Sequence, residues 1–145
     1  MQQFMKEALN EAKKALQENE VPVGAVIVRD GKIISTGRNR RETEQNALSH
    51  AEIEAINNAC KVLGSWRLDG CDIYVTLEPC PMCAGAIINS RISRVIYGTD
   101  DFKAGSCGSL VNLFSYPYNH KPEVVAGICG DECREILSNF FKKLR

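Results

Sequence analysis

The stretch DIYVTLEPCPMCAGAIINS, residues 72–90, decides the fold class. Its first six residues are apolar almost throughout, which is typical of a strand that is buried on both faces. Pro79 follows this strand closely, and Pro81 stands where proline is favoured, at the first position of a helix. A buried strand that leads directly into a helix is the building unit of an α/β protein.

The chain before this unit predicts a helix, a β-hairpin and a second helix. Apolar residues between Phe4 and Leu16 recur at helical spacing. Two runs with strand composition flank Asp30-Gly31, a dipeptide that favours a two-residue hairpin turn. The polar segment after the hairpin has no periodicity, so we expect a loop there. These elements are expected over residues 4–16 (helix), 23–28 and 32–38 (strands), 38–48 (loop) and about 50–63 (helix).

The chain after residue 90 continues the alternation of strands and helices. Strands are expected over 94–97 and 123–128, with a glycine-containing loop over 99–108 and a short helical piece over 110–114 between them. Asp131 is expected to cap a last helix that ends near Leu144. This order predicts a mixed five-stranded sheet with helices on both faces. The fold class is therefore α/β, a three-layer α/β/α architecture in one domain, residues 1–145.

The composition is that of an ordinary globular protein. Hydrophobic residues make up 44% and charged residues 25% of the 145 residues, which excludes a disordered or low-complexity chain. Lys plus Arg number 18 and Asp plus Glu also number 18, so the net charge is +0 and no overall basic field attracts nucleic acid. A nucleic-acid partner therefore requires local basic runs. Two are present, at Arg38, Arg40 and Arg41 and at Lys142, Lys143 and Arg145.

The cysteine content and the absence of targeting signals indicate a cytosolic protein. The first residues show no signal peptide, and no apolar run is long enough to span a membrane. The seven cysteines are odd in number, and close pairs in such a protein indicate metal or redox chemistry before disulfides. The seven are Cys60, Cys71, Cys80, Cys83, Cys107, Cys129 and Cys133.

Two short segments carry the chemistry: His50-Ala51-Glu52 and the pair Cys80 and Cys83. Both lie at predicted helix starts, where the helix dipole favours thiolates. Two thiolates and one imidazole give zinc three protein ligands and leave a fourth position open. Water bound at an open position can lose a proton near neutral pH, as in catalytic zinc sites. Glu52 is then placed as a proton-transferring base.

Other interpretations of these residues remain open at the level of sequence. Ser49 and Glu52 match a helix capping box, which assigns Glu52 a purely structural role. The pair Cys80 and Cys83 at a helix start also fits a thiol oxidoreductase. A structural zinc site is a third possibility, and it requires a fourth ligand. That ligand would be Cys60, Cys71 or His120.

The combination H-x-E with P-C-x-x-C resembles the signature of zinc-dependent nucleobase deaminases. The similarity to the bacterial TadA family of tRNA adenosine deaminases covers nearly the whole chain. It extends over residues 20–25, 37–40, 76–80, 82–87, 90–92, 105–110 and 140–141. The resemblance implies a cytidine-deaminase-like fold, a Zn²⁺ cofactor held by His50, Cys80 and Cys83, and Glu52 as the proton-shuttling residue.

The same resemblance implies a substrate and a partner. The expected reaction is the conversion of adenosine to inosine in the anticodon stem-loop of tRNA, at the wobble position, by a homodimer. Asn39 corresponds to the residue that contacts the base, and Asp101 to a loop residue near the nucleotide backbone. The alternative within enzymes is a deaminase of free nucleobases, nucleosides or nucleotides, of the guanine or cytosine type.

Overall fold

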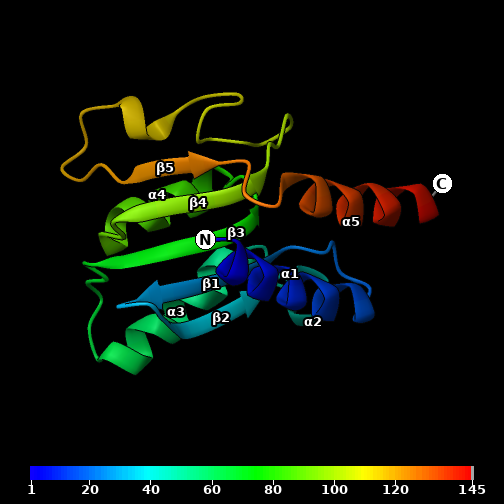
Figure 1. Ribbon diagram of the computed structural model, residues 1–145, viewed down its shortest axis with the longest axis horizontal. Coiled ribbons are helices and arrows are strands. Elements are labelled where there is room, and N and C mark those ends of the chain that lie inside the picture. Colours follow the sequence, from blue (N-terminus) through cyan, green and yellow to red (C-terminus); the bar gives the residue numbers. More distant parts are fainter. Residues whose placement is uncertain (145) are drawn as a thin grey trace.

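The computed structural model of the protein describes residues 1–144, so Arg145 of the second basic run lies outside the described residues. A five-stranded sheet forms the centre, and helices cover both of its faces (Figure 1). The elements in chain order are α1 (Gln2–Gln17), β1 (Gly24–Arg29), β2 (Lys32–Arg38), α2 (Arg41–Glu44), α3 (Ala51–Leu63), β3 (Cys71–Leu77), α4 (Pro81–Ser90), β4 (Arg94–Thr99), the 3₁₀ helix η1 (Leu113–Ser115), β5 (Glu123–Ala126) and α5 (Gly130–Lys143).

The sheet is mixed, as predicted. Its strand order is β2-β1-β3-β4-β5. β1 pairs antiparallel with β2 and with β3, whereas β3, β4 and β5 are parallel. β3 therefore occupies the middle of the sheet, which explains why its residues are apolar almost throughout. Asp30 and Gly31 both adopt left-handed backbone angles, with φ of 52° and 75°, so the hairpin turn also confirms the prediction.

Alternating residues of the strands define the three layers. On β1, Ala25 and Ile27 pack into the larger core with α3 and α4, whereas Val26 and Val28 pack against α1. This period of two is what a strand buried on both faces requires. In Figure 1, α1 crosses one face of the sheet, α3 and α4 lie behind it, and α5 extends beyond the end of β5. The predicted three-layer α/β/α fold is confirmed.

Two details of the prediction were wrong, and a third was right only in part. The polar segment after β2 contains the short helix α2, which an apolar period could not reveal because α2 has no buried residue. The helical piece expected over 110–114 is a single 3₁₀ turn, η1. Asp131 does not cap α5: the N-cap is Cys129, no side chain caps the helix, and the Asp131 carboxylate pairs with Arg134.

A close approach between α3 and β2 sets the position of the first residues of α3. A Cβ atom built on Gly37 would lie 2.3 Å from the carbonyl oxygen of Ala51 and 2.5 Å from the backbone nitrogen of Ala55. Both contacts are to helix backbone, which cannot turn aside as a side chain can. Glycine at position 37 therefore lets β2 hold the helix that begins directly after His50.

The substitution Gly37→Ala is expected to destabilise the protein by about 1–3 kcal/mol or more, because it overpacks a rigid contact. Gly85 is the matched control, since nothing lies within 4 Å of a Cβ built there. In the middle of α4, Gly85→Ala is expected to be neutral or to stabilise by up to about 1 kcal/mol through helix propensity. Denaturant unfolding measures both, and equal stability of the two variants would contradict this description of the contact.

Candidate active site and metal centre

Two helix starts bring the three predicted metal ligands together. His50 is the N-cap residue of α3 and Cys80 is the N-cap residue of α4, and neither side chain is used as a cap. Cys83 lies in the first turn of α4. The Nδ1 atom of His50 lies 3.6 Å from the Sγ atom of Cys80 and 3.6 Å from that of Cys83. All three ligand atoms lie within 4.8 Å of one another.

This donor set fits zinc. Bonds of about 2.3 Å to sulfur and 2.0–2.1 Å to nitrogen at tetrahedral angles place nitrogen and sulfur ligands about 3.6 Å apart. Both nitrogen–sulfur distances in the group agree with that value. Within residues 1–144 no further His, Cys, Asp or Glu joins the group, so Cys60, Cys71 and His120 do not supply a fourth ligand. The arrangement is that of an open, three-ligand site.

The electrostatics of the group also favour a divalent cation. The Cys83 thiol and, after it, the His50 ring hydrogen-bond to Cys80 and lower the pKa of Cys80 to about 4. The Cys80 sulfur in turn raises the pKa of His50, although burial and the Arg41 charge oppose this. The same sulfur, together with burial, raises the pKa of the Cys83 thiol. A thiolate at Cys80 thus lies between two proton donors, and a cation can take the place of those protons.

Glu52 lies beside this group but is not part of it. Its side chain is only 4% exposed. Burial raises the pKa of its carboxyl to about 7, while hydrogen bonds to its own backbone N–H and to the Cys83 thiol oppose the rise. A carboxyl with a pKa near neutrality can both accept and return a proton at physiological pH.

The capping-box interpretation of Glu52 was wrong. The helix begins at Ala51 with His50 as its N-cap, one residue later than a capping box starting at Ser49 requires. The Ser49 hydroxyl instead donates to the Glu44 carboxylate at 3.1 Å. The Glu52 carboxylate is therefore not committed to a capping box.

Asn39 lies in the segment between β2 and α2, with its side chain buried. Its amide nitrogen donates to the Val21 carbonyl at 3.2 Å, and its amide oxygen accepts from the Arg41 N–H at 3.1 Å. Asn39 thus shapes the turn in this structure. An amide has two N–H donors and two lone pairs, so one of each remains for another partner.

Asp101 begins a loop that borders the site on another side. Its carboxylate accepts from the backbone N–H groups of Lys103 and Ala104, which closes a local turn. The same loop reaches the metal-ligand segment, because Ser106 N–H donates to the carbonyl of Pro79 at 2.9 Å. Burial, followed by the charges of Glu78, Glu52 and Cys80, raises the pKa of the Cys107 thiol to about 12.

Two buried carboxylates near the site had no role in the sequence analysis. Glu20 accepts from the backbone of Glu42 and Thr43, and Glu78 accepts from the 101–109 loop. Both lie in segments that carry the family resemblance, residues 20–25 and 76–80, and this was the available signal. The sequence could not show that their partners are backbone groups more than twenty positions away.

The first basic run is partly neutralised by ion pairs. Arg38 binds Glu18 through two nitrogens, at 2.7 and 3.3 Å, and Arg40 pairs with Glu44 at 3.1 Å. Arg41 has no ion pair within residues 1–144.

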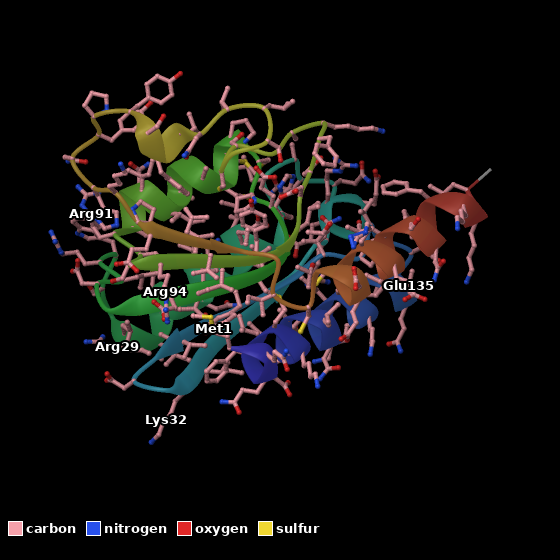
Figure 2. All side chains as sticks on the ribbon, turned by 45° about the horizontal axis from the view of Figure 1, so that its top comes forward. Met1, Arg29, Lys32, Arg91, Arg94 and Glu135 are labelled. Atoms are coloured by element: carbon pink, nitrogen blue, oxygen red, sulfur yellow. The ribbon has the colours of Figure 1, made fainter. Side chains whose placement is uncertain are left out.

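A further set of arginines lies around the amino-terminal ends of β3 and β4, away from the site: Arg29, Arg91 and Arg94. Figure 2 shows this set at one side of the molecule and Glu135 of α5 at the other.

In the second basic run, Lys142 and Lys143 are exposed at the end of α5. Phe140 and Phe141 precede them and pack edge to face, with ring centroids 5.3 Å apart. Phe141 remains 46% exposed. This end of α5 therefore combines positive charge with an accessible aromatic ring, two features of surfaces that bind single-stranded nucleic acid.

A three-layer α/β/α fold with His-x-Glu and Cys-x-x-Cys at two adjoining helix starts defines the class of nucleobase deaminases with a cytidine-deaminase-like fold. Comparison with known proteins identifies the family. The profile of the MafB19-like deaminases matches residues 1–145. A tRNA-specific adenosine deaminase of Bacillus subtilis (strain 168) is 53% identical over 143 residues, which are 98% of this chain and 89% of the relative. The chain belongs to the tRNA-specific adenosine deaminases.

Two solved structures refine this comparison. One comes from a study of A-to-I editing by tRNA:A34 deaminases at the wobble position of transfer RNA. It is 47% identical, has a TM-score of 0.92 and covers 94% of this chain and 100% of its own. A guanine deaminase of Bacillus subtilis is 41% identical with a TM-score of 0.66, and the match covers 83% of this chain and 76% of that protein. Membership of this family disfavours the thiol oxidoreductase interpretation.

The sequence analysis found no run long and apolar enough to span a membrane, and the helices can be compared with that expectation. Among residues 1–144, no helix combines the length and the apolar character needed to cross a bilayer. All seven cysteines belong to this part of the chain and are free thiols.

Proposed function

We propose that this protein deaminates adenosine to inosine in tRNA, at the wobble position of the anticodon, with a single deaminase domain over residues 1–145. The observation that carries the proposal is the meeting of His50, Cys80, Cys83 and Glu52 at two helix starts, in a chain about half identical to tRNA adenosine deaminases. The reaction consumes one water and releases one ammonia for each adenosine converted.

In this proposal Zn²⁺ is held by His50, Cys80 and Cys83. The agreement of the nitrogen–sulfur distances with a tetrahedral zinc site supports it. When bound, zinc supplies a Lewis acid that lets water lose a proton near neutral pH.

Glu52 moves the protons of the reaction. Its carboxylate takes a proton from water and delivers it to N1 of adenine, which makes C6 more electrophilic. The remaining hydroxide adds at C6, and Glu52 then moves the proton of the new C6 hydroxyl to the exocyclic amine. The C6–N bond breaks, ammonia leaves, and the oxygen stays on C6 as the carbonyl of inosine. The buried position of Glu52 supports this role, because burial brings its pKa close to neutrality and excludes competing solvent.

The segments around the site bind the substrate. Asn39 contacts the base through the N–H and lone pair that its backbone partners leave free. Asp101 lies near the nucleotide backbone, and Arg41 supplies positive charge for a phosphate. The target base is turned out of the anticodon loop toward the site, at small cost because the anticodon is already unpaired.

The protein acts as a homodimer in the cytoplasm, where its tRNA substrate is found. Four exposed apolar side chains are candidates for burial in a dimer: Val62 and Trp66 at and beyond the end of α3, and Leu110 and Val111 in the loop before η1.

A deaminase of free nucleobases is the second candidate, favoured by the likeness to a guanine deaminase. Zinc-loaded protein is incubated with tRNA that carries a wobble adenosine, and separately with guanine, cytosine and free adenosine. We expect inosine from the tRNA and no product from the free compounds. Turnover of guanine or cytosine without inosine in tRNA would assign the second function.

The substitution Glu52→Gln is expected to reduce the rate of inosine formation by at least about 10²–10⁴-fold, because an amide cannot carry a proton in general acid–base catalysis. Zinc content stays at one per chain, since Glu52 lies outside the ligand group. Glu54→Gln, two residues further along α3, is the control and should retain activity. Metal analysis and turnover are measured together. Loss of zinc in Glu52→Gln, or normal turnover, would contradict the assigned role.

The substitution Arg41→Ala is expected to weaken tRNA binding. It should also reduce the slope of log K against log salt concentration by about 1, the change expected for the loss of one phosphate contact. Arg38→Ala is the comparison, because Arg38 is engaged by Glu18 and should contribute less. Filter binding or fluorescence anisotropy at several salt concentrations measures both slopes. A larger effect at Arg38 than at Arg41 would show that the ion pair does not determine which arginine faces RNA.

A further inference from the structure

Two buried glutamates rely on hydrogen bonds to neutral groups rather than on an ion pair. Glu20 is 1% exposed and Glu78 is 2% exposed. Neither takes part in the ion pairs found among residues 1–144. A buried carboxylate is costly unless hydrogen bonds replace its hydration. Each of these two therefore needs a set of donors, and each finds that set in a segment distant in sequence.

Glu78 collects its donors from the 101–109 loop. One carboxylate oxygen accepts from the Asp101 N–H at 3.0 Å and from the Ser109 hydroxyl, and the other accepts from the N–H groups of Cys107 and Ser109 at 3.0 and 3.1 Å. A Cβ built on Gly105 would lie 2.5 Å from the same carboxyl group. The loop is thus wrapped around a single charged acceptor, at a distance that only glycine allows.

Glu20 holds the segment on the other side in the same manner. One of its oxygens accepts from the Glu42 N–H at 3.1 Å, and the other accepts from the N–H and the hydroxyl of Thr43 at 2.6 and 2.7 Å. These donors belong to the short helix α2, which directly follows Asn39 and Arg40. The helix has no buried residue of its own, so hydrogen bonds rather than apolar packing hold it in place.

Both anchored segments border the proposed active site. The Ser106 N–H donates to the carbonyl of Pro79, the residue before Cys80. On the other side, the Arg40 N–H donates to the carbonyl of Ser49, the residue before His50. Each buried carboxylate therefore joins one bordering segment to the body of the protein, within a short distance of a predicted metal ligand.

We propose that Glu20 and Glu78 are positioning residues that hold the 39–49 segment and the 101–109 loop in the conformation that receives the tRNA nucleotide. The role rests on the proposed function. Ordering the two segments before RNA arrives removes part of the entropy cost of binding, so the carboxylates act on substrate capture. The chemistry itself, at Glu52 and the three ligands, does not require them.

Glutamine is the informative substitution at both positions, since it keeps the size and removes the charge. Both carboxylate oxygens of Glu78 accept from backbone N–H groups. Glu78→Gln would keep only one acceptor oxygen, so its NH₂ group would point at an N–H donor and that hydrogen bond would be lost. In Glu20→Gln the NH₂ group would likewise point at the backbone N–H of either Glu42 or Thr43. Glu11→Gln is the matched control: Glu11 is also largely buried but pairs with Lys14 within α1 and holds no loop.

The experiment combines steady-state kinetics on tRNA, zinc analysis and amide hydrogen exchange. In Glu78→Gln we expect faster exchange at Cys107 and Ser109, and in Glu20→Gln faster exchange at Glu42 and Thr43, so each variant is the control for the other. KM for tRNA should rise about tenfold in each, the order of effect of one lost hydrogen bond to a charged group, with kcat within about twofold. Zinc content and the Glu11→Gln variant should match the wild type.

Several results would overturn the proposal. Unchanged exchange would mean that the carboxylates do not hold the segments, and unchanged KM with faster exchange would mean that their order does not serve binding. A fall in kcat alone, or loss of zinc, would assign these residues to the chemistry or the metal. If a Gln variant does not fold, Ser109→Ala and Thr43→Val each remove one hydroxyl donor, and a KM equal to that of the wild type would then refute the role. If the wild-type protein makes no inosine, the proposed function fails, while the exchange data still test the anchoring.

Discussion

The convergence of two helix starts at the carboxyl end of the central strand is the constraint on which the rest of the structure depends. β3 leads through Pro79 into α4, and α3 begins directly after His50, so the N-caps of both helices lie side by side. Proline at the first position of α4 needs no N–H partner, and neither N-cap side chain is used as a cap. The side chains of His50 and Cys80 are therefore available to a metal, in the positive field of two helix dipoles that favours thiolate.

Close backbone contacts and buried charges keep this arrangement in register. Gly37 lets the first turn of α3 rest on β2, and Gly105 lets the 101–109 loop close on Glu78. Glu20 holds α2 in the same way. It accepts hydrogen bonds from the N–H groups of Glu42 and Thr43, which have no partner within so short a helix. Specific polar contacts thus hold α2, and they add to the packing of Cys107 in the core for the 101–109 loop, as is expected of regions that must meet a polar substrate.

The sequence predicted the fold where periodicity or turn chemistry is strong. The buried run of β3, the Asp30-Gly31 hairpin and the proline start of α4 are all local signals, and each was confirmed. It failed where the partner is distant. The capping box at Ser49 is locally plausible, but the helix begins one residue later, and the Ser49 hydroxyl donates to Glu44 instead of capping it. The donors of Glu20 and Glu78 lie more than twenty positions away in the sequence. A pattern among neighbouring residues therefore cannot reveal them. The sequence predicted that His50, Cys80 and Cys83 form one group from their residue types, their spacing and the family resemblance, and the structure brings these three side chains together.

The central claim is that His50, Cys80 and Cys83 alone bind zinc from the protein and leave one position to water. X-ray absorption spectroscopy of the zinc-loaded protein at the zinc edge tests this directly. The account predicts two sulfur neighbours at about 2.3 Å and two nitrogen or oxygen neighbours at about 2.0–2.1 Å. Three sulfur neighbours would contradict it, because a third cysteine would then complete a closed structural site.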